Sequence, residues 1–404
     1  MKKKLITVAL ILALALSLFA CGSKDQGADT NTDTETEAEA EAEGEAEAEA
    51  DDVEMKVAMV TDYGDITDQS FNQTTYEACK EFCDANGVEF TYKKPATDAD
   101  ADRISSIEEA IEDGFNVIVM PGFAFAEAIY QVAPLYPEIK FVALDVSEGD
   151  LTAYGAREFS ADNVFSAVYK EELAGYMAGY AAVKLGYTKL GFLGGMAVPA
   201  VQRYGYGFVQ GADDAAVEGG VSGVEVKYVY GGQFFGDADI TAVMDTWYGA
   251  GTEVVFACGG GIFSSAAEAA AKVDGKVIGV DVDQAAIIDG AYGEGMTVTS
   301  AMKGLAPTVN TLLSAINAGN WADFAGQIQT LGLVSETPEN NYVQLPATTQ
   351  WGESFSEADY NTLVGELFAG TRTVDDSTDS VPADGSATPE TEAVTVDHQG
   401  TIKG

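Results

Sequence analysis

The strongest constraint on the fold is an alternation of short β-rich segments with longer helical ones across residues 54–370. β-Branched and aromatic residues predict strands at 56–61, 89–93, 116–120, 140–145, 189–194, 224–230, 253–257, 276–280 and 296–300. Most of the helical segments between them end in glycine, as helices commonly do, and they include 70–87, 101–114, 124–135 and 163–186. This order predicts parallel βα units and therefore an α/β fold.

The same pattern starts a second time at residue 189. Four predicted strands and one long helix precede this point, and KLGFLGG at 189–195 begins the succession again. The region is also longer than one hydrophobic core usually serves. We therefore expect two similar lobes, each a doubly wound parallel sheet.

The first 21 residues have the layout of a bacterial lipoprotein signal. MKKK gives a positive start, and the apolar run after it is shorter than the roughly 20 residues that span a bilayer. LFAC at 18–21 has the residue order of a lipobox. We therefore expect a signal peptide at 1–20 and lipid modification of Cys21, including a palmitate chain. The protein would then be anchored at the extracytoplasmic face of the cell membrane. An ordinary signal peptide with an incidental cysteine is the alternative.

Acidic polar segments follow this cysteine and end the chain. Residues 21–53 hold thirteen acids, which predicts an extended tether, and 371–404 are rich in Ser, Thr, Pro and Asp, which predicts a disordered acidic tail. Most of the formal net charge of −44 nevertheless lies between these segments. Such acidity disfavours nucleic acid and highly phosphorylated ligands and favours a neutral small molecule or a cation.

Neither the cysteines nor any catalytic motif indicates a reaction. Cys79 and Cys83 stand four apart on one predicted helix face, where apolar packing is favoured over a metal pair because no histidine lies nearby. The sequence has no HExxH, no GxSxG and no cysteine paired with a base. We expect a binding protein with no cofactor and no metal. Paired carboxylates leave a nucleoside hydrolase as the alternative.

Acids, rings and a lysine follow the carboxyl ends of the predicted strands, where open parallel sheets bind ligands. Both halves contribute: Asp62, Phe71, Asn72 and Asp145 from the first, and Phe235, Gly260, Asp281 and Lys303 from the second. Two rings in glycine- and acid-rich turns can sandwich a flat ligand. Carboxylates and a lysine can bind hydroxyl or ring N–H groups. A ligand held between two lobes is the interpretation that uses all of them.

Each of these residues also has an ordinary structural interpretation. A ring can anchor its own loop, an aspartate after a strand can cap a helix, and a lysine can be solvated. The glycines at 259–261 favour close approach of backbone to a neutral ligand. A phosphate-binding loop is rejected because GGGIFSS lacks the required lysine.

Several widely spaced motifs together resemble the basic membrane protein family of bacterial lipoproteins. They are TDYGDITDQSFNQ at 61–73, GFAF at 122–125, RYGYGFVQG at 203–211, QFFGD at 233–237, GVDVDQ at 279–284 and SAMKG at 300–304. The resemblance covers nearly all of residues 54–370 and implies a type I periplasmic-binding-protein fold, with two Rossmann-like lobes joined by a hinge. The sequence departs from the family pattern at two places. In DQSFN the family usually has a lysine after the aspartate, and the acidic tail is not a feature of the family.

The resemblance also implies residue roles and lobe boundaries. Two rings, Phe71 and Phe235, would stack on a base, with Phe234 as the alternative to Phe235. The base edge would meet Asp62, Asn72 and Asp145, and the ribose would be held by Asp281 and Lys303. The chain would cross between the lobes near 158–165, 281–290 and 325–335. Lobe 1 would then comprise 54–160 and 285–330, and lobe 2 would comprise 161–284 and 331–370.

The expected function is that of a monomeric, lipid-anchored receptor that closes on a purine nucleoside and passes it to the permease of an ABC importer. Closure can be driven only by contacts that the closed state makes. The first alternative is a sugar or another small polar ligand on the same fold, and the second is hydrolysis of the nucleoside. A sensory receptor that feeds a kinase would differ only in its partner.

Overall fold

The computed structural model describes residues 54–62, 64–153, 161–377 and 388–403. The predicted signal peptide, the predicted lipidation site Cys21 and the predicted acidic tether lie outside these residues. Within them, no helix combines the length and the apolar character needed to cross a membrane.

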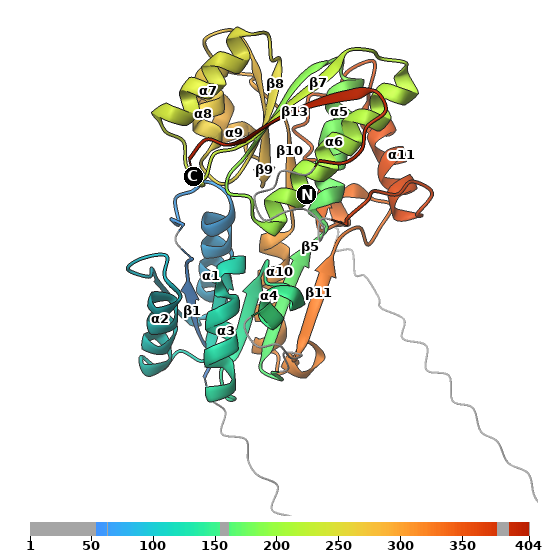
Figure 1. Cartoon of the computed structure of the whole chain (residues 1–404). Helices are drawn as coiled ribbons and strands as arrows, with labels where there is room; N and C mark the ends of the chain where they lie inside the picture. Colours follow the sequence, from blue (N-terminus) through green and yellow to red (C-terminus); the bar gives the residue numbers. More distant parts are fainter. Residues whose placement is uncertain (1–53, 63, 154–160, 378–387, 404) are drawn as a thin grey trace, which may run out of the picture. The chain divides into compact units, whose positions relative to one another are not determined.

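The first sheet has six strands among the described residues, and every neighbouring pair is parallel (Figure 1). Their order is β11 (Gln327–Leu331), β5 (Val164–Tyr169), β4 (Lys140–Leu144), β3 (Val117–Pro121), β1 (Lys56–Val60) and β2 (Glu89–Lys93). Side chains alternate between two helical layers because successive residues of a strand point to opposite faces. One layer is α1 (Phe71–Asn86) with α10 (Leu305–Asn317), and the other is α2 (Asp100–Glu112), α3 (Ala126–Val132) and α4 (Glu148–Ala153).

The second sheet has seven strands in the described part of the chain. Their order is β12 (Val343–Gln344), β10 (Thr297–Lys303), β9 (Lys276–Asp281), β8 (Val254–Cys258), β6 (Lys189–Gly194), β7 (Val224–Tyr230) and β13 (Val394–Thr401). Only β12 runs antiparallel to its neighbour among these strands. One face packs on α7 (Ala238–Gly249), α8 (Phe263–Ala270) and α9 (Ala285–Tyr292), and the other on α5 (Glu171–Lys184), α6 (Pro199–Gly219) and α11 (Glu357–Phe368).

Helices α5 and α6 approach each other backbone to backbone. A Cβ atom on Gly207 would lie 1.9 Å from the carbonyl oxygen of Glu172, and one on Gly175 would lie 2.1 Å from that of Tyr204. No side chain fits at either position, so glycine is required where these helices cross. The close contact brings the start of α5 beside the first turns of α6, and both of these ends reach the site described below.

The chain crosses between the sheets three times within the described residues. β5 leads into α5 at Lys170, β10 leads into α10 at Gly304, and 332–342 connect β11 with β12. Backbone hydrogen bonds tie these connections together. The Lys170 N–H donates to the end of β11 at 2.9 Å, and the Gly304 N–H donates to the Tyr342 carbonyl at 2.7 Å. The three connections therefore form a joined hinge rather than independent linkers.

The first crossing differs from the predicted one at 158–165. Residues 164–169, expected at the start of a long helix, form β5, which is buried at every position between β4 and β11. A short apolar run fits a buried strand as well as a helix, because neither shows a polar face. The first lobe therefore keeps this strand, and the helix begins only at Glu171.

The second crossing is also later than the predicted 281–290. Residues 285–303 form α9 and β10 and stay with the second sheet because β10 pairs with β9. The first lobe thus regains the chain at α10, not at residue 285. The third crossing overlaps the end of the predicted 325–335.

The predicted disordered tail, 371–404, contains a strand. β13 pairs in parallel with β7 at the edge of the second sheet (Figure 1). The Asp213 carboxylate accepts the backbone N–H groups of Glu392, Ala393 and Val394 just before it. The polar composition indicated that this segment cannot build its own core. It could not reveal that a distant sheet edge supplies the missing partners.

Candidate ligand-binding site

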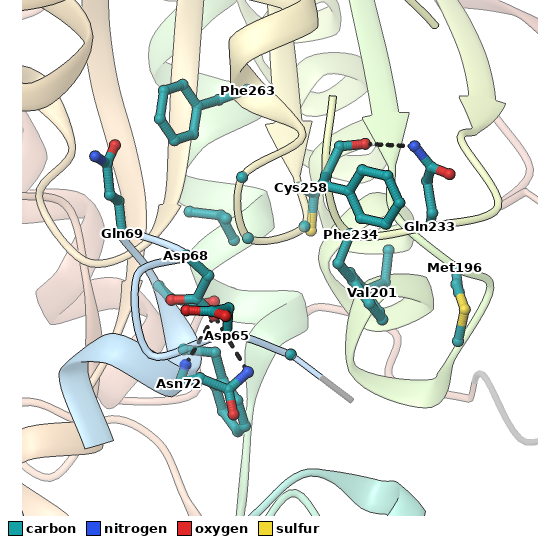
Figure 2. Close-up of a pocket in the computed structure, with 18 of the residues that line it drawn as sticks. Asp65, Asp68, Gln69, Asn72, Met196, Val201, Gln233, Phe234, Cys258 and Phe263 are labelled. Carbon is teal, nitrogen blue, oxygen red and sulfur yellow. Dashed lines mark hydrogen bonds between the residues drawn. The ribbon is translucent and has the colours of Figure 1, made fainter. Parts of the chain in front are cut away.

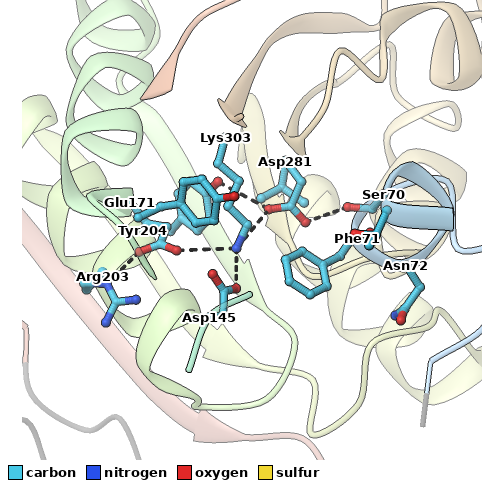
Figure 3. Close-up of polar contacts among 12 residues, drawn as sticks. Ser70, Phe71, Asn72, Asp145, Glu171, Arg203, Tyr204, Asp281 and Lys303 are labelled. Atoms are coloured by element: carbon cyan, nitrogen blue, oxygen red, sulfur yellow. Dashed lines mark hydrogen bonds and ion pairs between the residues drawn. The ribbon is translucent and has the colours of Figure 1, made fainter. Parts of the chain in front are cut away.

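A cavity of about 1160 Å³ lies at the carboxyl ends of both sheets. It is somewhat larger than the roughly 300–1,000 Å³ of typical small-molecule pockets, so a small polar ligand fits together with water. Its walls come from the segments after β1, β2, β3, β4, β6, β7, β8 and β9 and from the last residue of β10. All eight residues predicted to bind ligand line it, namely Asp62, Phe71, Asn72, Asp145, Phe235, Gly260, Asp281 and Lys303. Figure 2 shows part of this cavity, and Figure 3 labels Phe71, Asn72, Asp145, Asp281 and Lys303.

In the turn before α1, the residue that caps the helix is Asp68 and not Ser70. The Asp68 carboxylate accepts the backbone N–H groups of Ser70, Asn72 and Gln73 at 2.9, 2.9 and 3.0 Å and thereby caps the helix. The hydroxyl of Ser70 is thus not needed for the helix. Phe71 begins the helix at the cavity wall, and Figure 2 shows Asn72 beside Asp68.

Two hydrogen bonds connect this turn to the other sheet. The Ser70 hydroxyl donates to Asp281 at 2.7 Å, and the Gln284 side chain donates to the Gln69 carbonyl at 3.0 Å. Gln69 has a φ of 57°, a left-handed conformation that is uncommon outside glycine. The turn is therefore held in a particular conformation by contacts from both lobes.

A cluster of buried charges closes the hinge side of the cavity (Figure 3). The Lys303 ammonium lies 2.5 Å from Asp145, 3.4 Å from Glu171 and 3.7 Å from Asp281. Arg203 in turn pairs with Glu171 at 2.6 Å. Lys303 and Asp281 were predicted to act together on a ribose, but the nearest partner of Lys303 is Asp145 of the first lobe. One cation thus bridges carboxylates of both lobes.

Asp145 and Asp281 occupy equivalent places in the two halves. Asp145 directly follows β4, Asp281 is the last residue of β9, and their φ angles are 63° and 64°. Left-handed backbone is tolerated by aspartate better than by most residues but still stores strain, which is commonly found at functional sites. The shared conformation turns both carboxylates toward Lys303.

The pKa values of the cavity acids reflect burial. Desolvation raises the pKa of Asp62 to about 6, against the opposing hydrogen bond from the Gly64 N–H. Burial also raises the pKa of Asp145 to about 6, with Lys303 acting against this and Glu171 adding to it. Burial alone would lower the pKa of Lys303, but Asp145 and Asp281 raise it above its usual range. Lys303 therefore stays charged while the two acids titrate near neutrality.

The rings of the cavity lie in different surroundings. Phe71 is half-buried, and the Lys303 ammonium lies 4.5 Å from its ring centroid, a cation–π contact. The ring turn, residues 231–237 between β7 and α7, carries both candidates for the second ring. Phe234 is partly buried against the core, whereas Phe235 is 61% exposed. Both line the cavity (Figure 2 labels Phe234), so the alternative between them stays open.

Sequence reasoning missed four polar residues of this site. Glu171 follows β5, and the rule of looking after each strand could not find it because that strand was assigned to a helix. Arg203 and Tyr204 lie in α6, within a motif already noticed, and the Tyr204 hydroxyl donates to Asp281 at 3.3 Å. Ser70 lies within the TDYGDITDQSFNQ motif but was not among the predicted site residues. Arg203, Tyr204 and Ser70 lie inside motifs that were already noticed, so considering every residue of these motifs could have found them.

Comparison with known proteins decides the family. Residues 55–338 match the family model of PnrA-like ABC transporter substrate-binding proteins, named Bmp. The chain belongs to this family. The predicted resemblance is confirmed, and so is the role of a substrate-binding protein of an ABC transporter.

Individual relatives of this Bmp-family chain agree with the assignment. BmpA, an ABC transporter nucleoside-binding protein from Lactococcus lactis, is 30% identical over 57% of this chain and 65% of its own length. Basic membrane protein A1 from Borrelia garinii is 26% identical over 64% of this chain and 72% of that protein. A crystal structure of a solute-binding protein from Aeropyrum pernix has a TM-score of 0.60 at 22% identity, covering 80% of this chain and 88% of that one. The last similarity concerns the fold, and the expected type I periplasmic-binding-protein architecture is confirmed.

Burial of the Lys303 ammonium group leads to a prediction about the free energy of unfolding. Lys303→Met leaves Asp145, Glu171 and Asp281 without their shared partner, so we expect the free energy of unfolding in urea to fall by about 3–5 kcal/mol. Lys94→Met is the matched control, because Lys94 lines the same cavity but pairs with Asp65 at an exposed position. That change should cost about 1 kcal/mol or less. Equal losses for the two variants would contradict a central role for Lys303.

Proposed function

We propose that this chain captures a purine nucleoside in the cavity and delivers it to an ABC permease. Family membership supports the role of a transporter's substrate-binding component. The name of the similar Lactococcus lactis protein supports a nucleoside as the ligand. The purine preference rests on the arrangement of the cavity, as follows.

The observation that carries the proposal is that unpartnered acceptors and aromatic rings line one cavity. The buried oxygens Asn72 Oδ1 and Asp145 Oδ1 have no hydrogen-bond partner among the described residues, although buried polar atoms nearly always have one. Phe235 leaves most of its surface exposed in the same wall. A ligand with flat apolar faces and N–H or O–H groups at its edges satisfies both features. A purine nucleoside has this combination.

In this proposal the base stacks between the ring of Phe71 and the ring of either Phe234 or Phe235 in the ring turn. Stacking contributes roughly 1–3 kcal/mol per base and tolerates any planar heterocycle. Phe71 comes from the first lobe and the ring turn from the second, so a stacked base joins the lobes. Asp62, Asn72 and Asp145 line the cavity near the α1 turn and accept hydrogen bonds from the edge of the base.

The ribose is placed against Asp281 and Lys303. A carboxylate accepts from two neighbouring hydroxyl groups, and an ammonium donates to the same hydroxyl oxygens. The side chains of these two residues already lie within 3.7 Å of each other. The pair therefore provides both an acceptor and a donor for the hydroxyl groups of a pentose. No further charged group has to enter the cavity.

The lipid anchor is a further part of the proposal. A cysteine after LFA, followed by a long acidic segment, supports attachment at Cys21. Cells producing Cys21→Ser should release the protein into the soluble extracytoplasmic fraction, whereas the wild type should stay with membranes until detergent is added. Membrane retention of the variant would refute the anchor.

Calorimetric titration with inosine, guanosine, adenosine and ribose tests the ligand. We expect the purine nucleosides to bind and Phe71→Ala to lose at least about 1 kcal/mol of that affinity. Phe368→Ala is the control, because Phe368 is a partly exposed ring on α11 that does not line the cavity. Stronger binding of ribose than of every nucleoside would favour the sugar alternative. Release of free base after long incubation with inosine, followed by chromatography, would favour a hydrolase.

Ligand affinity should also depend on pH. Burial raises the pKa of Asp62 and of Asp145 to about 6, so both are charged acceptors at pH 7.5 and become protonated as the pH falls. We expect nucleoside affinity to decline between pH 7.5 and pH 5. In Asp145→Asn the affinity should be lower at pH 7.5 and its decline shallower. A wild-type affinity that is constant over this range would exclude the charged form as the acceptor.

A further inference from the structure

Residues 388–403 form a segment that lies beyond the family match, which ends at residue 338. We call residues 388–403 the C-terminal strap. Its strand β13 runs along β7 in register from Val394, opposite Val224, to His398, opposite Tyr228, and pairs again at Thr401 after a shift. The strap thereby covers an edge of the second sheet that would otherwise present unpaired backbone.

The strap is fastened by side chains along its length. The three N–H groups held by Asp213 fix its beginning, and the ring of His398 stacks on Tyr228 at a centroid distance of 5.0 Å. The Trp247 indole N–H donates to Gln399 at 3.0 Å. These contacts come from α6, β7 and α7, so the strap has one defined register on the sheet.

The end of the strap reaches the ring turn at residues 231–237. The Ile402 N–H donates to the carbonyl of Tyr230 at 2.8 Å, directly before that turn. Gly232 has a φ of 83°, and a Cβ atom there would lie 2.1 Å from the carbonyl oxygen of Lys403. The backbones of strap and turn therefore touch at a position where no side chain fits.

A chain of polar contacts leads from Lys403 to the candidate stacking rings. The Lys403 ammonium pairs with Asp237, whose carboxylate also caps α7 through two N–H groups. Asp237 accepts from the Gln233 side chain at 3.0 Å, and the same amide donates to the Phe235 carbonyl at 2.8 Å. Gln233, Phe234 and Phe235 line the cavity, whereas Lys403 does not. Lys403 is thus a positioning residue that acts through Asp237.

We propose that the C-terminal strap positions the ring turn and thereby sets the affinity of the cavity for its ligand. This inference rests on the proposed function, because it concerns the rings assigned to the base. On this proposal residues 388–403 support the ligand site although Lys403 does not line the cavity.

The first test is independent of any ligand. Hydrogen–deuterium exchange of the full chain compares the wild type with Lys403→Met and with Asp213→Asn, which loosen the two ends of the strap. Lys272→Met is the matched control, since Lys272 forms exposed ion pairs with Asp245 at 2.8 Å and Glu268 at 3.6 Å in the same lobe and its ion pairs include no residue of the ring turn. We expect amides 231–237 to exchange about threefold to tenfold faster in both strap variants and unchanged in the control. Equal exchange in all four proteins would overturn the proposal.

The second test is the affinity for inosine of the same proteins. We expect the dissociation constant to rise about threefold to tenfold in Lys403→Met, to return toward the wild-type value in Lys403→Arg and to stay unchanged in Lys272→Met. Faster exchange of the turn without a change in affinity would reduce the strap to a purely structural element and overturn its positioning role. If the wild type binds no nucleoside, the proposed function fails, while the exchange experiment still decides whether the strap holds the turn.

Discussion

Lys303 makes the contact on which the rest of the structure depends, because one ammonium group pairs with carboxylates of both lobes. Asp145 follows β4 of the first lobe, whereas Glu171 begins α5 and Asp281 ends β9 in the second. Removing charges from water is costly unless each has a partner, and here Arg203 supplies the second cation. Three carboxylates face two cations. Asp145 and Asp281 line the cavity, and Asp145 Oδ1 has no hydrogen-bond partner among the described residues, so the cluster that joins the lobes can also accept hydrogen bonds from a ligand.

The α1 turn shows how a small segment can serve folding and binding at once. Asp68 caps the helix, and this leaves the Ser70 hydroxyl to bond Asp281 across the cavity. Asn72 keeps one buried oxygen without a protein partner among the described residues. Because Asp68 alone caps the helix, Ser70 is available to contact the other lobe and Asn72 is available for the proposed ligand.

The sequence predicts the fold and the site through separate signals. All nine predicted strands occur with ends within three residues of the expected ones, because alternation with helices is a local property. The site followed from the rule that parallel sheets bind ligands at their carboxyl ends. β5 was missed because a run buried on both faces has no period, and β13 because its partner β7 lies far away in the sequence. Cys79 and Cys83 are buried in the core, as their apolar interpretation predicts.

The joined hinge has a consequence for the order of events in capture. If the lobes rotate about the bonded connections at Lys170, Gly304 and Tyr342, each atom travels in proportion to its distance from that axis. Lys303 directly precedes Gly304 and therefore hardly moves. On this geometry its pairs with Glu171 and Asp281, which lie in the same lobe, would be kept on opening, and an arriving solute would meet these fixed charges before the loops farther from the pivot exclude the solvent.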